Sequence, residues 1–266
     1  MKFLFLTDSH IKSNCPENRK DNYHQTVVNK LNEIVSISKE ENVDYILHGG
    51  DWYDRPYFDK PLSDEIAEII KNFEKPVYTI YGNHDIYGAS PMTLKGTMLG
   101  VLIEKNLVRL ISNDEIIFLK EDGLIVQLTG KSYKYGMDLV QNREKYYIVE
   151  KDEKADYAIH MVHGMLINRP FPLGIPFTLI NEITETGADI TLSGHYHSGY
   201  GIINMGNRCF ANPGSIVRII NYRSELSRIP KIIIIDIKEA INIRQIELKN
   251  VIPGPDVLDE QKLIFD

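Results

Sequence analysis

The chain has 266 residues, of which 43% are hydrophobic and 25% charged, a composition typical of a water-soluble globular protein with one α/β domain or two small ones. Its net charge of −7 argues against a general positive coat for nucleic acid, although a local patch or bound cations can supply that charge. Cys15 and Cys209 match no metal or redox spacing, and no apolar run approaches the roughly 18 residues of a membrane span, so we expect a cytoplasmic protein with no membrane partner.

The first part of the chain alternates predicted strands and helices. Short apolar runs typical of buried strands occur at residues 2–6, 43–48 and 76–81. Residues 23–41 place their apolar side chains on one face of a helix. Residues 62–73 predict a second helix with Ser63 as its N-cap. This β-α-β-α-β order predicts parallel strands packed against helices.

The later part of the chain is richer in strands. Residues 115–130 predict two strands joined by a turn at 121–123, and further strands are predicted at 156–162, 188–193, 208–220, 228–237 and 241–249. One sheet does not easily hold so many strands, so we expect an α/β fold with two packed mixed sheets flanked by helices, an αββα sandwich. We assign residues 1–250 to one catalytic domain. Residues 251–266 contain two prolines and no clear period, and they predict a C-terminal tail.

Polar side chains follow the predicted strands where each strand ends. They are Asp8, His10, Asp51, Asp54, Asn83, His84, Asp85, His163, His195 and His197. Because the carboxyl ends of parallel strands meet at one edge of a sheet, we expect these residues to converge. Carboxylate, imidazole and amide ligands without thiolate suit Mn²⁺, Fe or Zn²⁺. Seven candidate ligands are too many for one catalytic ion and fit two ions bridged by a carboxylate, as in phosphoryl transfer.

The Asn83-His84-Asp85 sequence predicts three different roles. Asn83 is expected to bind a metal, and His84 is the histidine left over for proton donation or contact with the transition state. Asp85 is expected to orient the His84 imidazole. Asp54 is expected beside the ligands without binding metal itself.

Five short motifs occur in order between residues 8 and 197. They are Asp-x-His, Gly-Asp, Gly-Asn-His-Asp, His-Gly and Gly-His-x-His, and Asn-Pro-Gly-Ser follows at 212–215. Together they resemble the signature of the calcineurin-like metallophosphoesterase superfamily and imply its fold. The resemblance implies one metal bound by Asp8, His10, Asp51 and His197, and a second bound by Asp51, Asn83, His163 and His195. It also implies two divalent ions, most readily Mn²⁺, with Fe²⁺ or Zn²⁺ as alternatives. A bridging hydroxide would attack phosphorus, and His84 would face the developing charge or protonate the leaving oxygen.

Two stretches narrow the resemblance to one branch of the superfamily. Residues 47–63 and 78–85 are similar to SbcD-type DNA exonuclease subunits, including bacteriophage members. This implies an exonuclease or endonuclease that acts on DNA with an SMC-like ATPase of the SbcC type. Fewer than 70 residues follow His197, too few for the DNA-capping domain usual in that branch.

Several alternatives stay open at this point. A general phosphodiesterase or a phosphoprotein phosphatase of the same superfamily fits the ligand set, and a non-catalytic scaffold is disfavoured because all seven ligands are present. The oligomeric state is open, with a homodimer as one option. The apolar residues of the tail either bury on a partner or pack on their own domain; they are Val257, Leu258, Leu263, Ile264 and Phe265.

Overall fold

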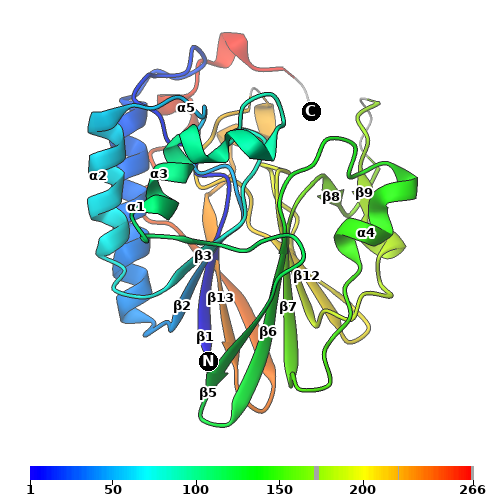
Figure 1. Ribbon diagram of the computed structural model, residues 1–266. Helices are drawn as coiled ribbons and strands as arrows, with labels where there is room; N and C mark the ends of the chain where they lie inside the picture. The colour runs from blue at the N-terminus through cyan, green and yellow to red at the C-terminus, as the bar shows by residue number, and fades with distance from the viewer. Residues whose placement is uncertain (171–173, 221, 265–266) are drawn as a thin grey trace.

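The computed structural model describes residues 1–170, 174–220 and 222–264. Two six-stranded mixed sheets form its centre (Figure 1). The first has the order β14-β13-β1-β2-β3-β4, made of Ile241–Glu247, Lys231–Ile237, Lys2–Leu6, Tyr45–His48, Val77–Thr79 and Arg109–Leu110. The second has the order β11-β12-β10-β7-β6-β5, made of Gly201–Met205, Arg208–Asn212, Ile190–Gly194, Tyr157–His163, Leu124–Lys131 and Ile116–Glu121.

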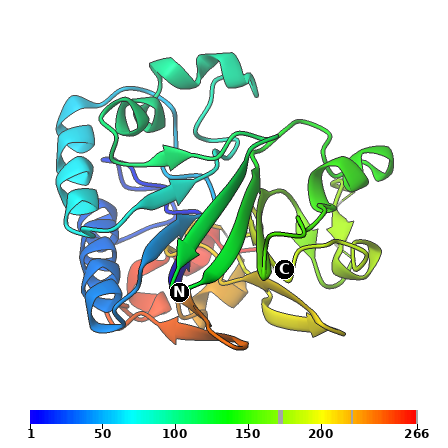
Figure 2. The ribbon, with the colours of Figure 1, turned by 60° about the horizontal axis from the view of Figure 1, so that its bottom comes forward.

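Helices flank the pair of sheets, as Figures 1 and 2 show from two directions. The longer helices lie on the first sheet's side: α1 (Tyr23–Glu40), α2 (Lys60–Lys71) and α3 (Met98–Glu104). The short α4 (Arg143–Tyr147) and the two-stranded sheet of β8 (Leu166–Ile167) and β9 (Thr178–Leu179) lie on the other side. The remaining helical turns are α5 (Gly254–Val257), η1 (Pro91–Gly96), η2 (Val140–Asn142), η3 (Ile180–Glu182), η4 (Arg223–Leu226) and η5 (Glu260–Lys262). The predicted sandwich of two mixed sheets flanked by helices is therefore confirmed.

The alternation of side chains in β1 explains the layers. Phe3 and Phe5 point into the core between the two sheets, whereas Leu4 and Leu6 pack under the helices. A strand buried on both faces has no polar side to expose to water, which is why residues 3–6 of β1 form an uninterrupted apolar run.

The strand register places the ends of several strands side by side. β1 pairs in parallel with β2 so that Leu6 lies opposite His48, and His48 in turn lies opposite Thr79 of β3. In the second sheet, β7 and β10 run parallel with Gly194 opposite His163. The loops that carry the predicted site residues therefore leave the two sheets at the same end of the molecule.

The start of α2 differs from its prediction. The helix begins at Lys60, and Asp59 is its N-cap, because the Asp59 carboxylate accepts a hydrogen bond from the Leu62 N–H at 3.2 Å. Pro61 fits the first turn, where no N–H is needed. The prediction of Ser63 as N-cap is therefore wrong: Ser63 lies inside the helix.

The predicted turn between β5 and β6 is confirmed. Asp122 and Gly123 lie between the two strands, with φ angles of 49° and 83°. Such positive values suit an Asp or Gly in a tight hairpin.

The end of the chain packs against its own fold. Val257 and Leu258 are buried, and Leu258 forms a β-bridge with Arg19. Ile264 is 55% exposed, and Phe265 lies outside the described residues. Two of the apolar side chains considered for a partner are thus covered by this chain. Among the described helices, none has the length and apolarity that crossing a bilayer requires.

Buried cationic side chains fix the loop after β12. Each of four successive backbone carbonyls accepts one hydrogen bond: Ser215 from Arg228 Nη1 at 2.7 Å, Ile216 from Lys30 Nζ at 2.9 Å, Val217 from Arg228 Nη2 at 2.7 Å, and Arg218 from Arg19 Nη1 at 2.9 Å. Burial, and then repulsion from Arg19, Arg228 and Arg218, lowers the pKa of Lys30 to about 7. The loop is held by a lysine that loses its proton near neutral pH.

This pKa predicts how stability changes with pH. Between pH 7 and the usual lysine pKa of 10.5, the unfolded chain keeps a proton on Lys30 that the folded chain has lost. The free energy of unfolding should therefore gain a contribution rising by about 1.4 kcal/mol per pH unit in this window. The free energy of unfolding of Lys30→Met, measured with urea at several pH values, should lack this contribution. Lys39→Met, the same replacement at an exposed position of α1, should keep it. Equal slopes in the wild type and Lys30→Met would contradict the assignment.

Candidate metal centre

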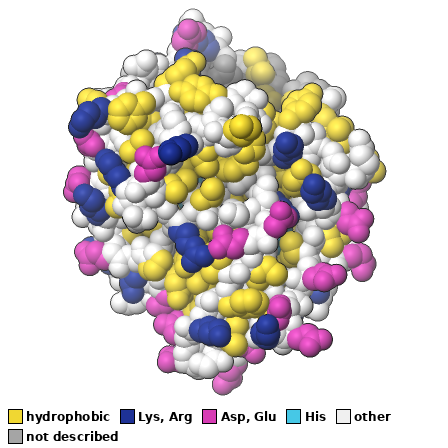
Figure 3. Space-filling model, viewed as in Figure 1, with side chains coloured by type: hydrophobic (Ala, Val, Ile, Leu, Met, Phe, Trp, Pro, Cys, Tyr) yellow, Lys and Arg dark blue, Asp and Glu magenta, His cyan; other side chains and the backbone are white. Residues whose placement is uncertain are grey.

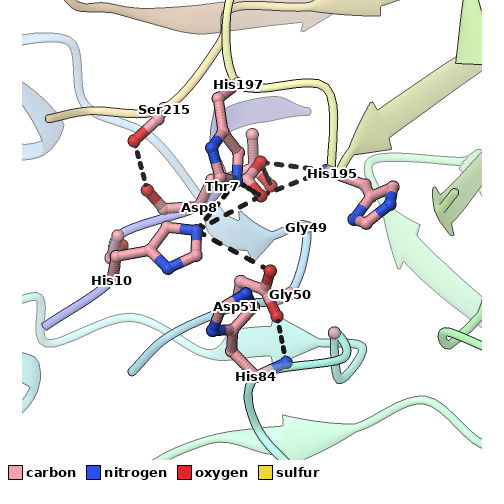
Figure 4. Close-up of polar contacts among 12 residues, drawn as sticks. Thr7, Asp8, His10, Gly49, Gly50, Asp51, His84, His195, His197 and Ser215 are labelled. Atoms are coloured by element: carbon pink, nitrogen blue, oxygen red, sulfur yellow. Dashed lines mark hydrogen bonds and ion pairs between the residues drawn. The ribbon is translucent and has the colours of Figure 1, made fainter. Parts of the chain in front are cut away.

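The predicted site residues converge at the carboxyl ends of the strands (Figure 4). Asp8 and His10 follow β1, Asp51 follows β2, and Asn83 and His84 follow β3, while His163 ends β7 and His195 and His197 follow β10. The ligand atoms fall into three groups, in each of which all atoms lie within 4.8 Å of one another: Asp8, His10, Asp51 and His197; Asp51, His163 and His195; and His10, Asp54 and His84. Asp51 belongs to two of these groups.

Several of these residues have an unusual backbone. Asp8, His10, Asp51 and His195 have φ angles of 52°, 42°, 53° and 77°, in the left-handed region that residues with a side chain rarely adopt. Such conformations cost about 1–3 kcal/mol each and persist where the surrounding structure imposes them, often at functional sites. Four of the nine non-glycine residues with positive φ in the described part of the chain are thus predicted site residues.

In the first group, two imidazoles face each other across a short gap. His10 Nε2 and His197 Nε2 are 3.0 Å apart, and both lie near carboxylates, with His10 Nε2 3.7 Å from Asp51 Oδ2 and His197 Nε2 3.5 Å from Asp8 Oδ1. Burial, and then repulsion between the two rings, lowers the pKa of His10 well below its ordinary value. Burial lowers the pKa of His197 to about 3. Both rings are therefore neutral at neutral pH, the form in which imidazole binds metal.

In the second group, Asp51 and His163 form a buried pair. His163 donates from Nδ1 to the Gly49 carbonyl at 2.7 Å, which leaves Nε2 facing Asp51 Oδ2 at 3.3 Å. Burial by itself lowers the pKa of His163, but attraction to Asp51 outweighs it and raises the pKa to about 9. Attraction to His163 likewise outweighs burial at Asp51 and lowers the pKa of the Asp51 carboxyl well below its ordinary value. A positive charge is thus favoured between these two atoms.

The other members of the site are tuned by burial. Burial, and then repulsion from His163, lowers the pKa of His195 to about 4. Burial is the largest influence on Asp8 as well and, reinforced by repulsion from Asp51, raises its pKa to about 6. Burying the carboxylates of Asp8 and Asp51 in one site removed from water costs free energy unless cations lie between them.

Four buried polar atoms in the site have no hydrogen-bond partner among the described residues. They are Asp51 Oδ2, Asn83 Oδ1, His163 Nε2 and His10 Nδ1. Buried polar groups are almost always paired, so unpaired atoms on residues of the expected ligand set call for a further partner. The first three belong to the ligand set expected for the second metal, and oxygen and imidazole nitrogen without thiolate suit Mn²⁺, Fe²⁺ or Zn²⁺. The residues present therefore fit divalent cations.

The role expected for Asp85 needs correction. Its carboxylate accepts hydrogen bonds from the backbone N–H groups of Asp51, Trp52 and Gly82 at 2.8, 3.0 and 2.9 Å, so it ties the β2 and β3 loops together. Burial, and then repulsion from Asp51, raises its pKa to about 7. The prediction that Asp85 orients the His84 imidazole is wrong, because its oxygens are engaged by the backbone.

The backbone of Asp54 orients His84 instead. His84 Nδ1 donates to the Asp54 carbonyl oxygen at 2.7 Å, which leaves Nε2 free to meet a ligand. The His84 ring meets the His10 ring edge-on at a centroid distance of 4.8 Å. Its backbone N–H also donates to Asp51 Oδ1 at 2.8 Å. The Asp54 side chain lies beside the site, with Oδ1 3.8 Å from His10 Nδ1 and Oδ2 3.0 Å from Lys12 Nζ.

Sequence reasoning missed several supporting residues. Thr7 donates to Asp8 Oδ2 at 2.7 Å, and Ser215 donates to the Asp8 carbonyl at 2.7 Å (Figure 4). His48 stacks on Trp52 at 3.7 Å between ring centroids and bonds to Ser9 and the Gly50 N–H, which links the β1 and β2 loops. The contact of Thr7 with Asp8 was not expected from the sequence, whereas Ser215 falls within the Asn-Pro-Gly-Ser motif at 212–215.

Gly82 is required by a close approach. A Cβ at this position would collide with Asp51 Oδ1 and with the Asp51 backbone. The glycine that interrupts the β3 run before Asn83 therefore makes room for the central carboxylate.

Comparisons with known proteins agree with this geometry. The model of the calcineurin-like phosphoesterase family matches residues 1–199. The chain is 25% identical over 227 residues to the DNA double-strand break repair protein Mre11 of Methanococcus maripaludis, a match that covers 81% of this chain. The chain spans only 57% of that relative's length.

A dimetal phosphatase of known structure has the same fold. A dimetal phosphatase from Danio rerio superposes with a TM-score of 0.58 at 11% identity, over 92% of this chain and 95% of that one. A novel archaeal phosphodiesterase superposes with a TM-score of 0.44 at 18% identity, over 93% of this chain and 100% of that one. The family model matches most of this chain. The chain therefore belongs to the calcineurin-like phosphoesterase family and is a metal-dependent phosphoesterase.

Proposed function

We propose that the chain is a dinuclear-metal phosphodiesterase that hydrolyses DNA. In this proposal one ion is held by Asp8, His10, Asp51 and His197, and the other by Asp51, Asn83, His163 and His195. The observation that carries it is the position of Asp51, which is shared by two ligand groups and has an unpaired, buried oxygen. Mn²⁺ is the proposed native ion, with Fe²⁺ and Zn²⁺ as alternatives.

The protein's own residues would divide the work of hydrolysis. Bound divalent ions supply charge neutralisation at phosphate and a water of lowered pKa. A new P–O bond forms to the water-derived oxygen, and the P–O bond to the leaving sugar breaks. His84 presents Nε2 to the leaving oxygen and donates a proton to that oxygen. The Asp54 carbonyl holds the imidazole in place by accepting a hydrogen bond from Nδ1.

Two observations support DNA as the substrate. The relative from Methanococcus maripaludis is named as a DNA double-strand break repair protein, and the sequence around Asp51 and Asn83 resembles SbcD-type nucleases. Figure 3 shows Lys and Arg interspersed with Asp and Glu on the face drawn, without one large basic field. With a net charge of −7, binding of DNA would depend on contacts close to the metals.

A partner would strengthen such weak binding. We propose an SMC-like ATPase in this role, and exposed residues such as Ile264 in the final segment as part of its docking site, since Val257 and Leu258 are buried within this chain.

A general phosphodiesterase or phosphoprotein phosphatase is the competing function. Hydrolysis with Mn²⁺ of linear DNA, a cyclic nucleotide, a phosphopeptide and bis(p-nitrophenyl) phosphate tests these proposals. DNA should give the highest kcat/KM, and preference for the phosphopeptide would overturn the nuclease assignment.

The shared carboxylate yields one prediction. Asp51→Asn keeps the size of the side chain and the acceptor for the His84 N–H but removes the negative charge that both ions share. Metal analysis of purified protein should show loss of both ions together. Asp64→Asn, the same change at an exposed position of α2, should keep both. Two ions per chain retained in folded Asp51→Asn would disprove the shared ligand.

His84 yields a second prediction. His84→Gln should leave metal content unchanged while kcat falls by roughly 10²–10⁴-fold, the usual contribution of a positioned general acid. His163→Gln serves as the comparison and should lose metal. Because His84 also lies in a group with His10 and Asp54, the metal content of His84→Gln decides between the two roles. Metal loss matching that of His163→Gln would make His84 a ligand.

A further inference from the structure

Two hollows adjoin the metal centre on the His84 side. The smaller, of about 340 Å³, is lined by Asp54, Arg55, Pro56, Tyr57, Asn83 and His84. The larger, of about 580 Å³, shares three of these residues and extends along the loop of residues 11–17. The side chain proposed to meet the leaving oxygen thus opens directly onto a space with its own lining. With His84 in its proposed role, a group attached to that oxygen would extend toward this space.

The lining includes the aromatic side chain of Tyr57, which is not buried in the core. Tyr57 is 62% exposed, although burial of an aromatic ring is normally favourable. Its ring is supported on one side by Tyr87, at 5.5 Å between centroids and 61° between planes. A ring held in this way beside a phosphoryl-transfer site can stack on a nucleobase, a contact worth about 1–3 kcal/mol per base.

Positive charge lies next to this ring. The Arg55 side chain is 74% exposed, and its Nε atom is 4.0 Å from Asp54 Oδ2, whereas Lys12 occupies the same carboxylate at 3.0 Å. With Lys12 held by Asp54, Arg55 is the more exposed cation of the lining. A guanidinium in this position can donate hydrogen bonds to a phosphate oxygen.

The larger hollow adds a buried polar group. Tyr53 lines it and is 1% exposed, and its hydroxyl has no hydrogen-bond partner among the described residues. An unpaired hydroxyl in a dry position is costly, and a polar ligand in the hollow would relieve that cost.

We propose that Arg55 and Tyr57 form a subsite for the nucleotide on the leaving side of the scissile phosphate. Tyr57 stacks on its base, and Arg55 contacts the phosphate that follows it. The inference rests on the proposed function, hydrolysis of DNA. Since a base can stack on Tyr57 only when it is free of its duplex neighbours, the subsite selects unpaired nucleotides, in single strands or at frayed ends.

The test uses a short single-stranded oligodeoxynucleotide, and the same strand with an abasic residue on the leaving side, in the presence of Mn²⁺. Tyr57→Ala should raise KM for the intact strand roughly 5- to 100-fold, in line with the loss of one stacked base. Tyr57→Phe, which keeps the ring, should match the wild type. On the abasic strand, Tyr57→Ala and the wild type should have equal KM values.

Phe58→Ala is the matched control for the loop. Phe58 is 58% exposed and adjoins Tyr57 but lines neither hollow, so its loss should leave KM unchanged. Arg55→Gln should raise KM and reduce the dependence of KM on salt, because one phosphate contact is lost. Metal content should stay at the wild-type level in all four variants.

The outcomes separate this inference from the function on which it rests. If the wild type cleaves DNA but Tyr57→Ala behaves like Phe58→Ala, the subsite is overturned and the nuclease function stands. If the wild type hydrolyses bis(p-nitrophenyl) phosphate but cleaves neither strand, the proposed function fails, and the subsite fails with it.

Discussion

The carboxylate of Asp51 lies in a fully buried position, with Oδ2 3.3 Å from Nε2 of His163. Asp8, which is also buried, repels it, and neutral imidazoles of His10 and His195 surround it. Such a concentration of negative charge in a dry site is costly unless cations lie within it. Attraction to Asp51 raises the pKa of His163 to about 9, so a proton on this imidazole places positive charge beside the carboxylate. Proton and metal thus compete for the same position.

The surrounding backbone is shaped to hold this charge. Asp8, His10, Asp51 and His195 all adopt left-handed φ angles, and hydrogen bonds between loops hold them there. Asp85 accepts N–H groups from the β2 and β3 loops, and Thr7 and Ser215 bind Asp8 from two sides. Strain of this kind lasts only where neighbouring contacts enforce it. The site is therefore prepared by the fold before any ion arrives.

The support extends as far as the end of the chain. Ser215 lies in the loop whose carbonyls are held by Arg19, Lys30 and Arg228, and the Arg218 side chain donates to the Ile252 carbonyl at 2.7 Å. The final segment is thus connected through this loop to Asp8. Its packing against the fold is part of what holds the metal centre in shape.

The sequence by itself determined the layers of the fold and named the candidate ligands. Apolar runs ending in Gly, Asp, Asn or His predicted strands with a polar edge, since strand periodicity and ligand chemistry are local properties of the chain. Only the tertiary structure decided Asp59 as the N-cap of α2, the Asp54 carbonyl as the partner of His84, and the backbone contacts of Asp85. Each of these depends on which groups from separate loops meet in space, and a carboxylate next to a histidine in sequence need not face it. The exposure of Tyr57 beside the candidate metal centre likewise follows from packing, because tyrosine is found both buried and exposed and the sequence alone does not choose between them.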